Sequence, residues 1–131
     1  MTTDAAATIL LVDDDAGTLT LIATILRGEG YTVLTAEDGP SAIAMAEKYP
    51  VPIQLLVADV VLPGMNGRDL ALRLGATRPE MKVLYISGYI ARTAVQEQMI
   101  MGSFKEGAHF LAKPFRTDDL LRRVGAVLRG M

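Results

Sequence analysis

Ile9-Leu10-Leu11-Val12 is a run of four apolar residues that stops at three consecutive acids, Asp13-Asp14-Asp15. A short, continuous apolar run of this kind is typical of a strand that is buried on both faces of a sheet. The abrupt change to aspartate then marks the end of the strand. The N-terminal part of the chain therefore predicts a buried parallel strand with a polar group of residues at its tip.

Outward from this strand, apolar runs alternate with segments of helical periodicity. Apolar and β-branched content predicts further strands at 31–36, 53–58, 82–86 and 110–112. Apolar spacing and turn residues predict helices at 18–29, at 39–46, after the turn at Gly67 to about Thr77, within 91–101, and a last helix with Thr117 as its N-cap. Strands separated by helices form a parallel sheet that carries helices on both faces. We therefore expect an α/β fold.

Composition limits the classes of protein that the chain can belong to. Its 131 residues suit one domain, with a core over about 8–130, and the absence of cysteine excludes disulfides and thiolate metal sites. A net charge of −2 argues against a nucleic-acid partner. Asp13 to Asp15 interrupt the first apolar run, and no apolar stretch approaches the roughly 18 residues that span a bilayer. We expect a cytoplasmic protein that does not contact the membrane.

Polar side chains follow four of the five predicted strands. Asp13 to Asp15 end the first, Asp59 the third, Ser87 the fourth and Lys113 the fifth. In an open parallel sheet the ligand crevice lies beyond the carboxyl ends of the strands, and a 2-1-3-4-5 strand order would bring these groups together. Clustered acids stay ionised when a cation lies among them, and their oxygens suit Mg²⁺. A carboxylate in such a site can form an aspartyl phosphate, while Lys113 and Ser87 offset the phosphoryl charge.

Four motifs carry a resemblance to a known family: Leu11-Val12-Asp13-Asp14-Asp15, Asp59-Val60-Val61-Leu62-Pro63-Gly64-Met65-Asn66-Gly67, Ser87-Gly88-Tyr89 and Lys113-Pro114-Phe115. In their order and spacing they resemble the receiver domain of two-component response regulators, over essentially the whole chain. The amino-acid sequences of the last two motifs are most similar to those of receivers of hybrid sensor histidine kinases. The resemblance implies a doubly wound, five-stranded, flavodoxin-like (βα)5 fold, the CheY-like fold, with strand order 2-1-3-4-5, in a single domain over 1–131.

The resemblance also implies a metal-dependent phosphoacceptor. Asp59 would accept the phosphoryl group. Asp14 and Asp59 would coordinate Mg²⁺ directly, the Val61 carbonyl would be a third protein ligand, and Asp13 would act largely through water. The donor would be a sensor histidine kinase or a phosphotransfer protein. Such a domain is not an enzyme in the usual sense, since it catalyses only its own phosphorylation and dephosphorylation.

Three further residues receive roles from the same resemblance. Lys113 would pair with the phosphoryl oxygens, held by a cis Lys113–Pro114 bond. The Ser87 hydroxyl would move toward the phosphate, and Phe110 would turn inward as an aromatic switch, which changes the face presented to a downstream protein effector. Taken alone, Phe110 fits an ordinary core position equally well.

Two other functions remain open at this point. A Mg²⁺-dependent phosphohydrolase of the haloacid dehalogenase type would use Asp13 as nucleophile and Asp15 as acid, but Gly17 stands where that family's motif has threonine. The second alternative is a binding module of the receiver fold that works without phosphorylation. Asp13 to Asp15 could also simply cap the first helix.

Overall fold

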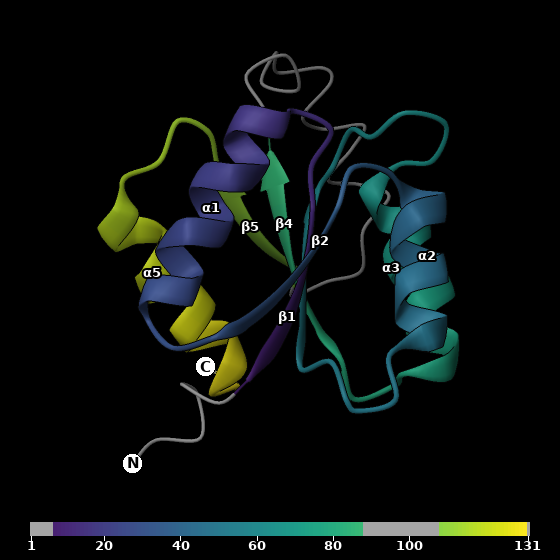
Figure 1. Cartoon of the computed structure of the whole chain (residues 1–131). Helices are drawn as coiled ribbons and strands as arrows, with labels where there is room; N and C mark the ends of the chain where they lie inside the picture. Colours follow the sequence, from purple (N-terminus) through teal and green to yellow (C-terminus); the bar gives the residue numbers. More distant parts are fainter. Residues whose placement is uncertain (1–6, 88–107, 131) are drawn as a thin grey trace.

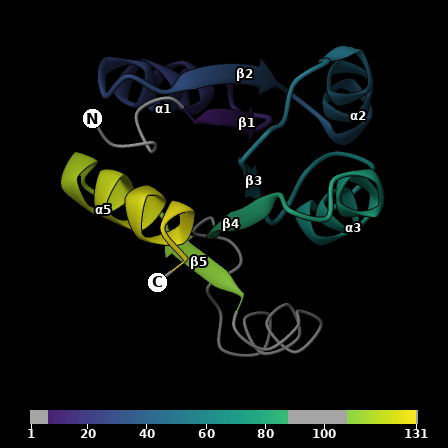
Figure 2. The same cartoon turned by 90° about the horizontal axis from the view of Figure 1, so that it is seen from below.

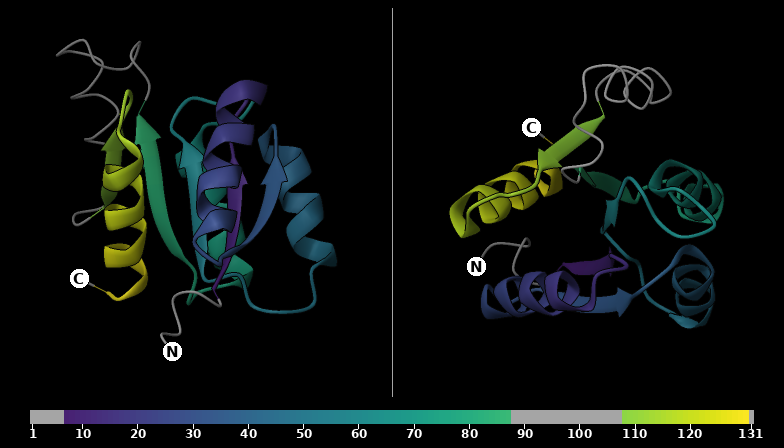
Figure 3. Two further views of the ribbon diagram at one scale, coloured as in Figure 1. Left: turned by 60° about the vertical axis from the view of Figure 1, so that its left-hand side comes forward. Right: turned by 90° about the horizontal axis from the view of Figure 1, so that it is seen from above.

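The computed structural model describes residues 7–87 and 108–130. Its centre is a five-stranded sheet in the order β2-β1-β3-β4-β5, which confirms the predicted 2-1-3-4-5 arrangement. Every neighbouring pair is parallel, so the strand arrows in Figure 3 run in one direction. The strands are β1 (Thr8–Val12), β2 (Thr32–Ala36), β3 (Leu55–Asp59), β4 (Lys82–Ser87) and β5 (His109–Ala112).

Helices cover both faces of this sheet, as the alternating pattern predicts. Figures 1 and 2 show α1 and α5 on one face and α2 and α3 on the other. The bounds are α1 (Ala16–Gly28), α2 (Gly39–Lys48), α3 (Gly67–Thr77) and α5 (Thr117–Leu128). The helix predicted within 91–101 lies outside the described residues. The fold is therefore the doubly wound α/β fold expected from the sequence.

The sheet separates two apolar layers. Ile9, Leu11 and Val57 pack with α1 and α5, whereas the intervening Leu10 and Leu56 pack with α2 and α3. Successive side chains of a strand point to opposite faces, so a strand between two helical layers needs apolar residues at every position. All residues of β1 and β3 are buried. This explains the continuous apolar run that ends at Asp13.

The residue predicted to cap the last helix differs in the structure. Thr117 is the first helical residue of α5, not its N-cap; the N-cap is Arg116. The Asp119 carboxylate accepts a hydrogen bond from the Arg116 backbone N–H at 3.2 Å. An acid at the third helical position can bond back to the N-cap backbone, so the first turn is stabilised without the Thr117 hydroxyl as a cap. The prediction of Thr117 as N-cap was therefore wrong by one residue.

Arg78 joins α3 to the end of α2. Its guanidinium donates to the carbonyl oxygens of Ala46 at 2.9 Å, Tyr49 at 2.9 Å and Val51 at 3.1 Å. The last carbonyls of a helix have no partner within the helix, and a cation is favourable there. Arg78 thus fixes the segment that leads into β3, the strand on which Asp59 stands.

Replacing Arg78 by methionine is expected to lower the free energy of unfolding by about 2 kcal/mol, because three hydrogen bonds from a charged donor are lost. The Ala46 carbonyl keeps the backbone N–H of Tyr49 as a partner. Urea unfolding followed by circular dichroism measures this. Arg73→Met is the matched control, since Arg73 is an exposed residue of α3, the helix that Arg78 follows. Equal effects of the two substitutions would contradict a specific role for Arg78.

Candidate functional site

Three acids meet at the carboxyl edge of the sheet. Val12 of β1 pairs with Ala58 of β3, so Asp13 and Asp59 are the next residues on two adjacent strands. Carboxylate oxygens of Asp13, Asp14 and Asp59 all lie within 4.8 Å of one another. Asp13 and Asp59 are buried, with 1% and 7% of their surface exposed, whereas Asp14 is exposed. The group is therefore an oxygen-rich cluster that opens to solvent on one side.

Lys113 extends from the end of β5 into this cluster. Its ammonium Nζ lies 2.9 Å from Asp13 Oδ2 and 3.0 Å from Asp59 Oδ2. The Lys113 backbone N–H donates to the Ser87 carbonyl at 2.8 Å, which ties the residue to the end of β4. The Lys113–Pro114 bond is cis, as the resemblance implies. Residues a hundred positions apart in sequence thus form one compact group.

Burial and charge act in opposite directions on Asp59. Desolvation raises the pKa of its carboxyl, and the charge of Asp13 adds to this effect, whereas the hydrogen bond and charge of Lys113 oppose it; the pKa is raised on balance. For Lys113, burial alone would lower the pKa, but its contacts with Asp13 and Asp59 outweigh burial and raise it. Burial therefore disfavours the ionised form of Asp59, whereas the neighbouring Lys113 stays protonated.

This pKa shift predicts that Asp59 destabilises the metal-free chain at neutral pH. The folded state binds the Asp59 proton more tightly than the unfolded state, so stability falls as the pH rises from the ordinary carboxyl pKa of 3.8 through the raised one. Asp59→Asn removes this destabilisation, and Asp13 remains as the ion-pair partner of Lys113. We expect its thermal midpoint to exceed that of the unaltered chain at pH 7 without divalent ions, and the difference to shrink toward pH 4. A variant that melts lower at pH 7 would contradict this reasoning.

The remaining predicted residues lie near the same edge or one strand away. Asp59 pairs with Ile86 in the β3–β4 register, so Ser87 is the next residue along β4, where it is half-buried. Val61 follows β3 at the rim, and its side chain is exposed. Its backbone N–H forms a hydrogen bond to the Asp59 carboxylate that lowers the pKa of that group. The Val61 carbonyl as a metal ligand stays a prediction.

Phe110 has a partner that sequence reasoning missed. It is the cross-strand neighbour of Tyr85, and the two rings stack with centroids 5.4 Å apart at 30°. Tyr85 is buried and Phe110 half-buried, so Phe110 is neither free at the surface nor part of the deep core. The aromatic content of both strands was a signal, but only the strand register shows that these two rings meet.

Gly67 was read from the sequence simply as a turn residue, yet its backbone lies against the end of β3. Its backbone N–H donates to the Val60 carbonyl at 2.9 Å, which closes the loop between β3 and α3. A Cβ added at Gly67 would overlap the Asp59 carbonyl oxygen. Only glycine allows α3 to begin this close to the acid.

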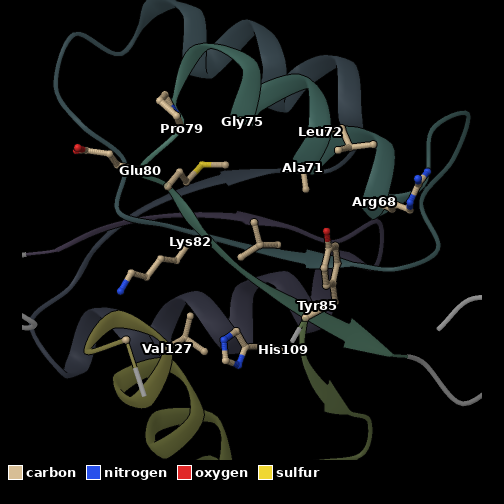
Figure 4. A pocket seen from close by; sticks show the side chains of 14 residues that line it. Arg68, Ala71, Leu72, Gly75, Pro79, Glu80, Lys82, Tyr85, His109 and Val127 are labelled. Atoms are coloured by element: carbon tan, nitrogen blue, oxygen red, sulfur yellow. The ribbon is translucent and has the colours of Figure 1, made fainter. Parts of the chain in front are cut away.

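A groove of about 740 Å³ lies elsewhere, along α3, β4 and the start of β5. In Figure 4, Tyr85 extends from β4 toward Leu72 and Arg68 of α3. Among the described residues that line the groove, neither Lys113 nor any of the three clustered acids is present. Asp13, Asp14, Asp59 and Lys113, to which the sequence analysis assigned the chemistry, therefore lie in the acid cluster and not along this groove.

Comparison with known proteins identifies the family. The model of the response regulator receiver domain matches residues 9–125. The chain belongs to this family. The chain is 35% identical over 122 residues to the probable transcriptional regulatory protein TcrX of Mycobacterium tuberculosis. The matched region covers 93% of this chain and 50% of that protein. It is 32% identical to the sensor kinase CckA of Brucella abortus, covering 94% of this chain and 13% of the kinase.

Solved structures agree with this assignment. A CheY-like receiver domain protein of Methanospirillum hungatei superposes with a TM-score of 0.79 at 29% identity, covering 95% of each chain. The resemblance expected from the sequence is therefore confirmed, and relatives include both a sensor kinase and transcriptional regulators. The chain spans about half the length of the regulators and a smaller part of the kinase.

Family membership establishes the general role of the domain. Receiver domains are phosphoacceptor signalling switches that work with sensor histidine kinases, and they are not enzymes in the usual sense. Across residues 7–87 and 108–130, no helix has the length and apolar character needed to cross a membrane.

Proposed function

We propose that this receiver domain accepts a phosphoryl group on the carboxylate of Asp59, in a Mg²⁺-dependent transfer from the phosphohistidine of a histidine kinase or phosphotransfer protein, or from a small phosphodonor. One observation carries the proposal. Asp59 stands at the end of the central strand β3 with the Lys113 ammonium 3.0 Å away and two further carboxylates within 4.8 Å. A nucleophile, a counter-charge and metal-binding oxygens thus share one edge of the sheet.

The donor set fits magnesium. Carboxylate oxygens are hard ligands, and Mg²⁺ retains several waters, which a cluster open on one side accommodates. Asp14 and Asp59 would bind the ion directly, the Val61 carbonyl would be the third protein ligand, and the buried Asp13 would act through water. Bound there, the ion would neutralise charge on the acids and on the transferring phosphoryl oxygens.

The reaction needs little covalent chemistry from the protein. A carboxylate oxygen of Asp59 bonds to phosphorus as the bond from phosphorus to the donor imidazole nitrogen breaks, and the imidazole leaves with that electron pair and takes up a proton from water. The Lys113 ammonium stays protonated, as its raised pKa favours, and pairs with the phosphoryl oxygens. The Ser87 hydroxyl donates to the same oxygens.

The signal would then spread from Ser87 to Phe110. Movement of the Ser87 hydroxyl toward the phosphoryl group vacates space at the end of β4, and Phe110 turns inward from its half-buried position beside Tyr85. A differential contact of a few kcal/mol suffices to shift such a two-state equilibrium. The downstream partner in this proposal is a protein effector, and the domain, with its core over about 8–130, acts in the cytoplasm without contacting nucleic acid or membrane.

The position of Asp15 weighs against the phosphohydrolase alternative. Its carboxylate caps α1, accepting from the Thr18 backbone N–H at 2.8 Å and from the Thr18 hydroxyl at 2.6 Å. These bonds lower the pKa of Asp15, which opposes a role as proton donor. The complete set of Asp14, Asp59 and Lys113 likewise argues against a module that has lost phosphorylation.

Incubation with acetyl phosphate and Mg²⁺ tests the proposal. We expect intact-mass spectrometry to show one added phosphoryl group, and we expect EDTA to prevent the addition because the metal is needed. Failure to incorporate phosphoryl with Mg²⁺ present, from acetyl phosphate and from a phosphorylated histidine kinase alike, would favour the phosphorylation-independent module.

A further inference from the structure

Val61 lies in the loop between β3 and α3, and hydrogen bonds fix both ends of this loop. The Val60 N–H donates to the Ile86 carbonyl, and the Gly67 N–H donates to the Val60 carbonyl, both at 2.9 Å. Between these ends Val61 is exposed, whereas Met65 is half-buried and packs into the apolar layer of α2 and α3. The side chain of Met65 is therefore placed to fix the middle of the loop.

Met65 packs against the first residue of α2. Gly39 begins this helix and is buried. A Cβ added at Gly39 would lie 2.8 Å from Met65 Sδ, 3.2 Å from Met65 Cβ and 3.4 Å from Met65 Cγ. The optimal separation of two carbon atoms is about 3.5–4.0 Å, so a larger residue in place of Gly39 would displace the methionine. Glycine at this position thus lets the loop pack directly on the backbone of α2.

The start of α2 is itself fixed, and it is connected to the acid cluster. The Asp38 carboxylate caps the helix by accepting a backbone N–H at 2.7 Å. The preceding strand, β2, ends at Ala36, whose carbonyl accepts from the Asp13 backbone N–H at 3.2 Å. Met65 therefore packs on the segment between β2 and α2, and this segment also holds the backbone of Asp13.

We propose that Met65 is a positioning residue: its side chain, packed on Gly39, fixes the loop that holds the Val61 carbonyl at the acid cluster. The inference rests on the proposed Mg²⁺ site. It extends that proposal to a side chain that touches neither the metal nor the phosphoryl group. A loop that is not fixed at Met65 presents Val61 for only part of the time, and the apparent dissociation constant for Mg²⁺ rises in proportion.

Magnesium titrations of Met65 variants, followed by ¹H–¹⁵N NMR, test this role. Met65→Ala is expected to bind Mg²⁺ about tenfold more weakly than the unaltered chain, as is typical when support for a metal ligand is lost. Met65→Leu keeps the volume of the side chain and should bind like the unaltered chain. Phosphoryl incorporation from acetyl phosphate should be slow in Met65→Ala at low Mg²⁺ and recover when Mg²⁺ saturates the site.

Met45→Ala is the matched control, because Met45 is a half-buried methionine of α2 in the same apolar layer. Both truncations remove similar apolar contact, so both should lower the thermal midpoint to a similar extent. A second readout needs no metal: the Val61 N–H bonds to the Asp59 carboxylate, so its hydrogen exchange reports the position of the loop. This exchange should become faster in Met65→Ala and stay unchanged in Met45→Ala.

Gly39→Ala tests the same contact from the side of α2. Its added methyl group displaces Met65, so Mg²⁺ binding should weaken in this variant as well. The two substitutions act through one contact, and their effects should not add. The double variant is therefore expected to bind Mg²⁺ no more weakly than Met65→Ala alone. Should Met65→Ala fail to fold, Gly39→Ala decides the question, because it leaves every side chain in place.

The outcomes separate this inference from the proposed function. Unchanged Mg²⁺ affinity and unchanged Val61 exchange in a folded Met65→Ala would overturn the positioning role while the metal site stands. Equal weakening in Met65→Ala and Met45→Ala would overturn it too, since the loss would then follow stability. Absence of Mg²⁺ binding to the unaltered chain would refute the metal site, and the metal-free exchange of Val61 would still decide whether Met65 fixes the loop.

Discussion

Asp59→Asn is expected to reduce phosphoryl incorporation from acetyl phosphate and Mg²⁺ to below detection. An amide oxygen is a far weaker nucleophile toward phosphorus than a carboxylate, and the substitution removes one of the proposed metal ligands. Because burial raises the pKa of Asp59, the variant should fold at least as well as the unaltered chain. The loss would therefore reflect chemistry and not unfolding. Intact-mass spectrometry after a fixed incubation measures it.

Asp38→Asn is the matched control for this experiment. Asp38 is the half-buried N-cap of α2 and accepts from the Ser41 N–H at 2.7 Å, and asparagine caps helices equally well. It should label like the unaltered chain. Continued labelling of Asp59→Asn would refute Asp59 as the acceptor. Turnover of a phosphate ester that Asp13→Asn abolishes and Asp59→Asn retains would point instead to the phosphohydrolase.

Gly67→Ala is expected to lower both the stability of the chain and the rate of phosphoryl incorporation. The added Cβ would overlap the Asp59 carbonyl oxygen, so the backbone at the end of β3 or the start of α3 must move. Overpacking of this kind costs about 1–3 kcal/mol of stability. Displacement of Asp59 would also slow labelling, because a shift near 1 Å can slow a reaction by about a hundredfold. Urea unfolding and initial labelling rates measure the two effects.

Gly75→Ala supplies the comparison within the same helix. None of the described residues places an atom within 4 Å of a Cβ at Gly75. Alanine there should stabilise α3 by about 0.5–1 kcal/mol and leave labelling unchanged, because glycine is a poor helix former. Similar labelling rates for Gly67→Ala and Gly75→Ala would show that the close approach at Asp59 is unimportant.

The sequence predicts the layers of this fold because burial on both faces leaves a visible pattern. The uninterrupted apolar residues before Asp13 correspond to β1, every residue of which is buried. The strand order cannot be predicted in this way, since spacing alone shows only that each polar group ends a strand at the same edge of the sheet. The motif resemblance supplied the order 2-1-3-4-5, and the structure confirms it.

Errors in the predicted bounds have local causes. The strand predicted at 53–58 runs from Leu55 to Asp59, since Ile53 is buried against the helices without belonging to the strand. The first helix begins at Ala16 instead of Thr18 because Asp15 is its N-cap. Hydrophobic patterns record burial, whereas element ends depend on individual hydrogen bonds that such patterns do not contain.

The site, like the fold, could be predicted only in part from the sequence. The residue types at the strand ends predict an acid cluster with a lysine, and the structure brings Asp13, Asp14, Asp59 and Lys113 together. The stacking of Phe110 on Tyr85 and the contact at Gly67 could not be predicted, because both depend on backbone positions in three dimensions.

Mapping the phosphoryl group to one residue tests the central claim most directly. The protein is labelled with acetyl phosphate and Mg²⁺, the acyl phosphate is reduced with borohydride to homoserine, and peptides are sequenced by mass spectrometry. The account predicts modification at Asp59 alone, and none when EDTA is present. Modification at Asp13 or Asp14 with Asp59 intact would contradict it.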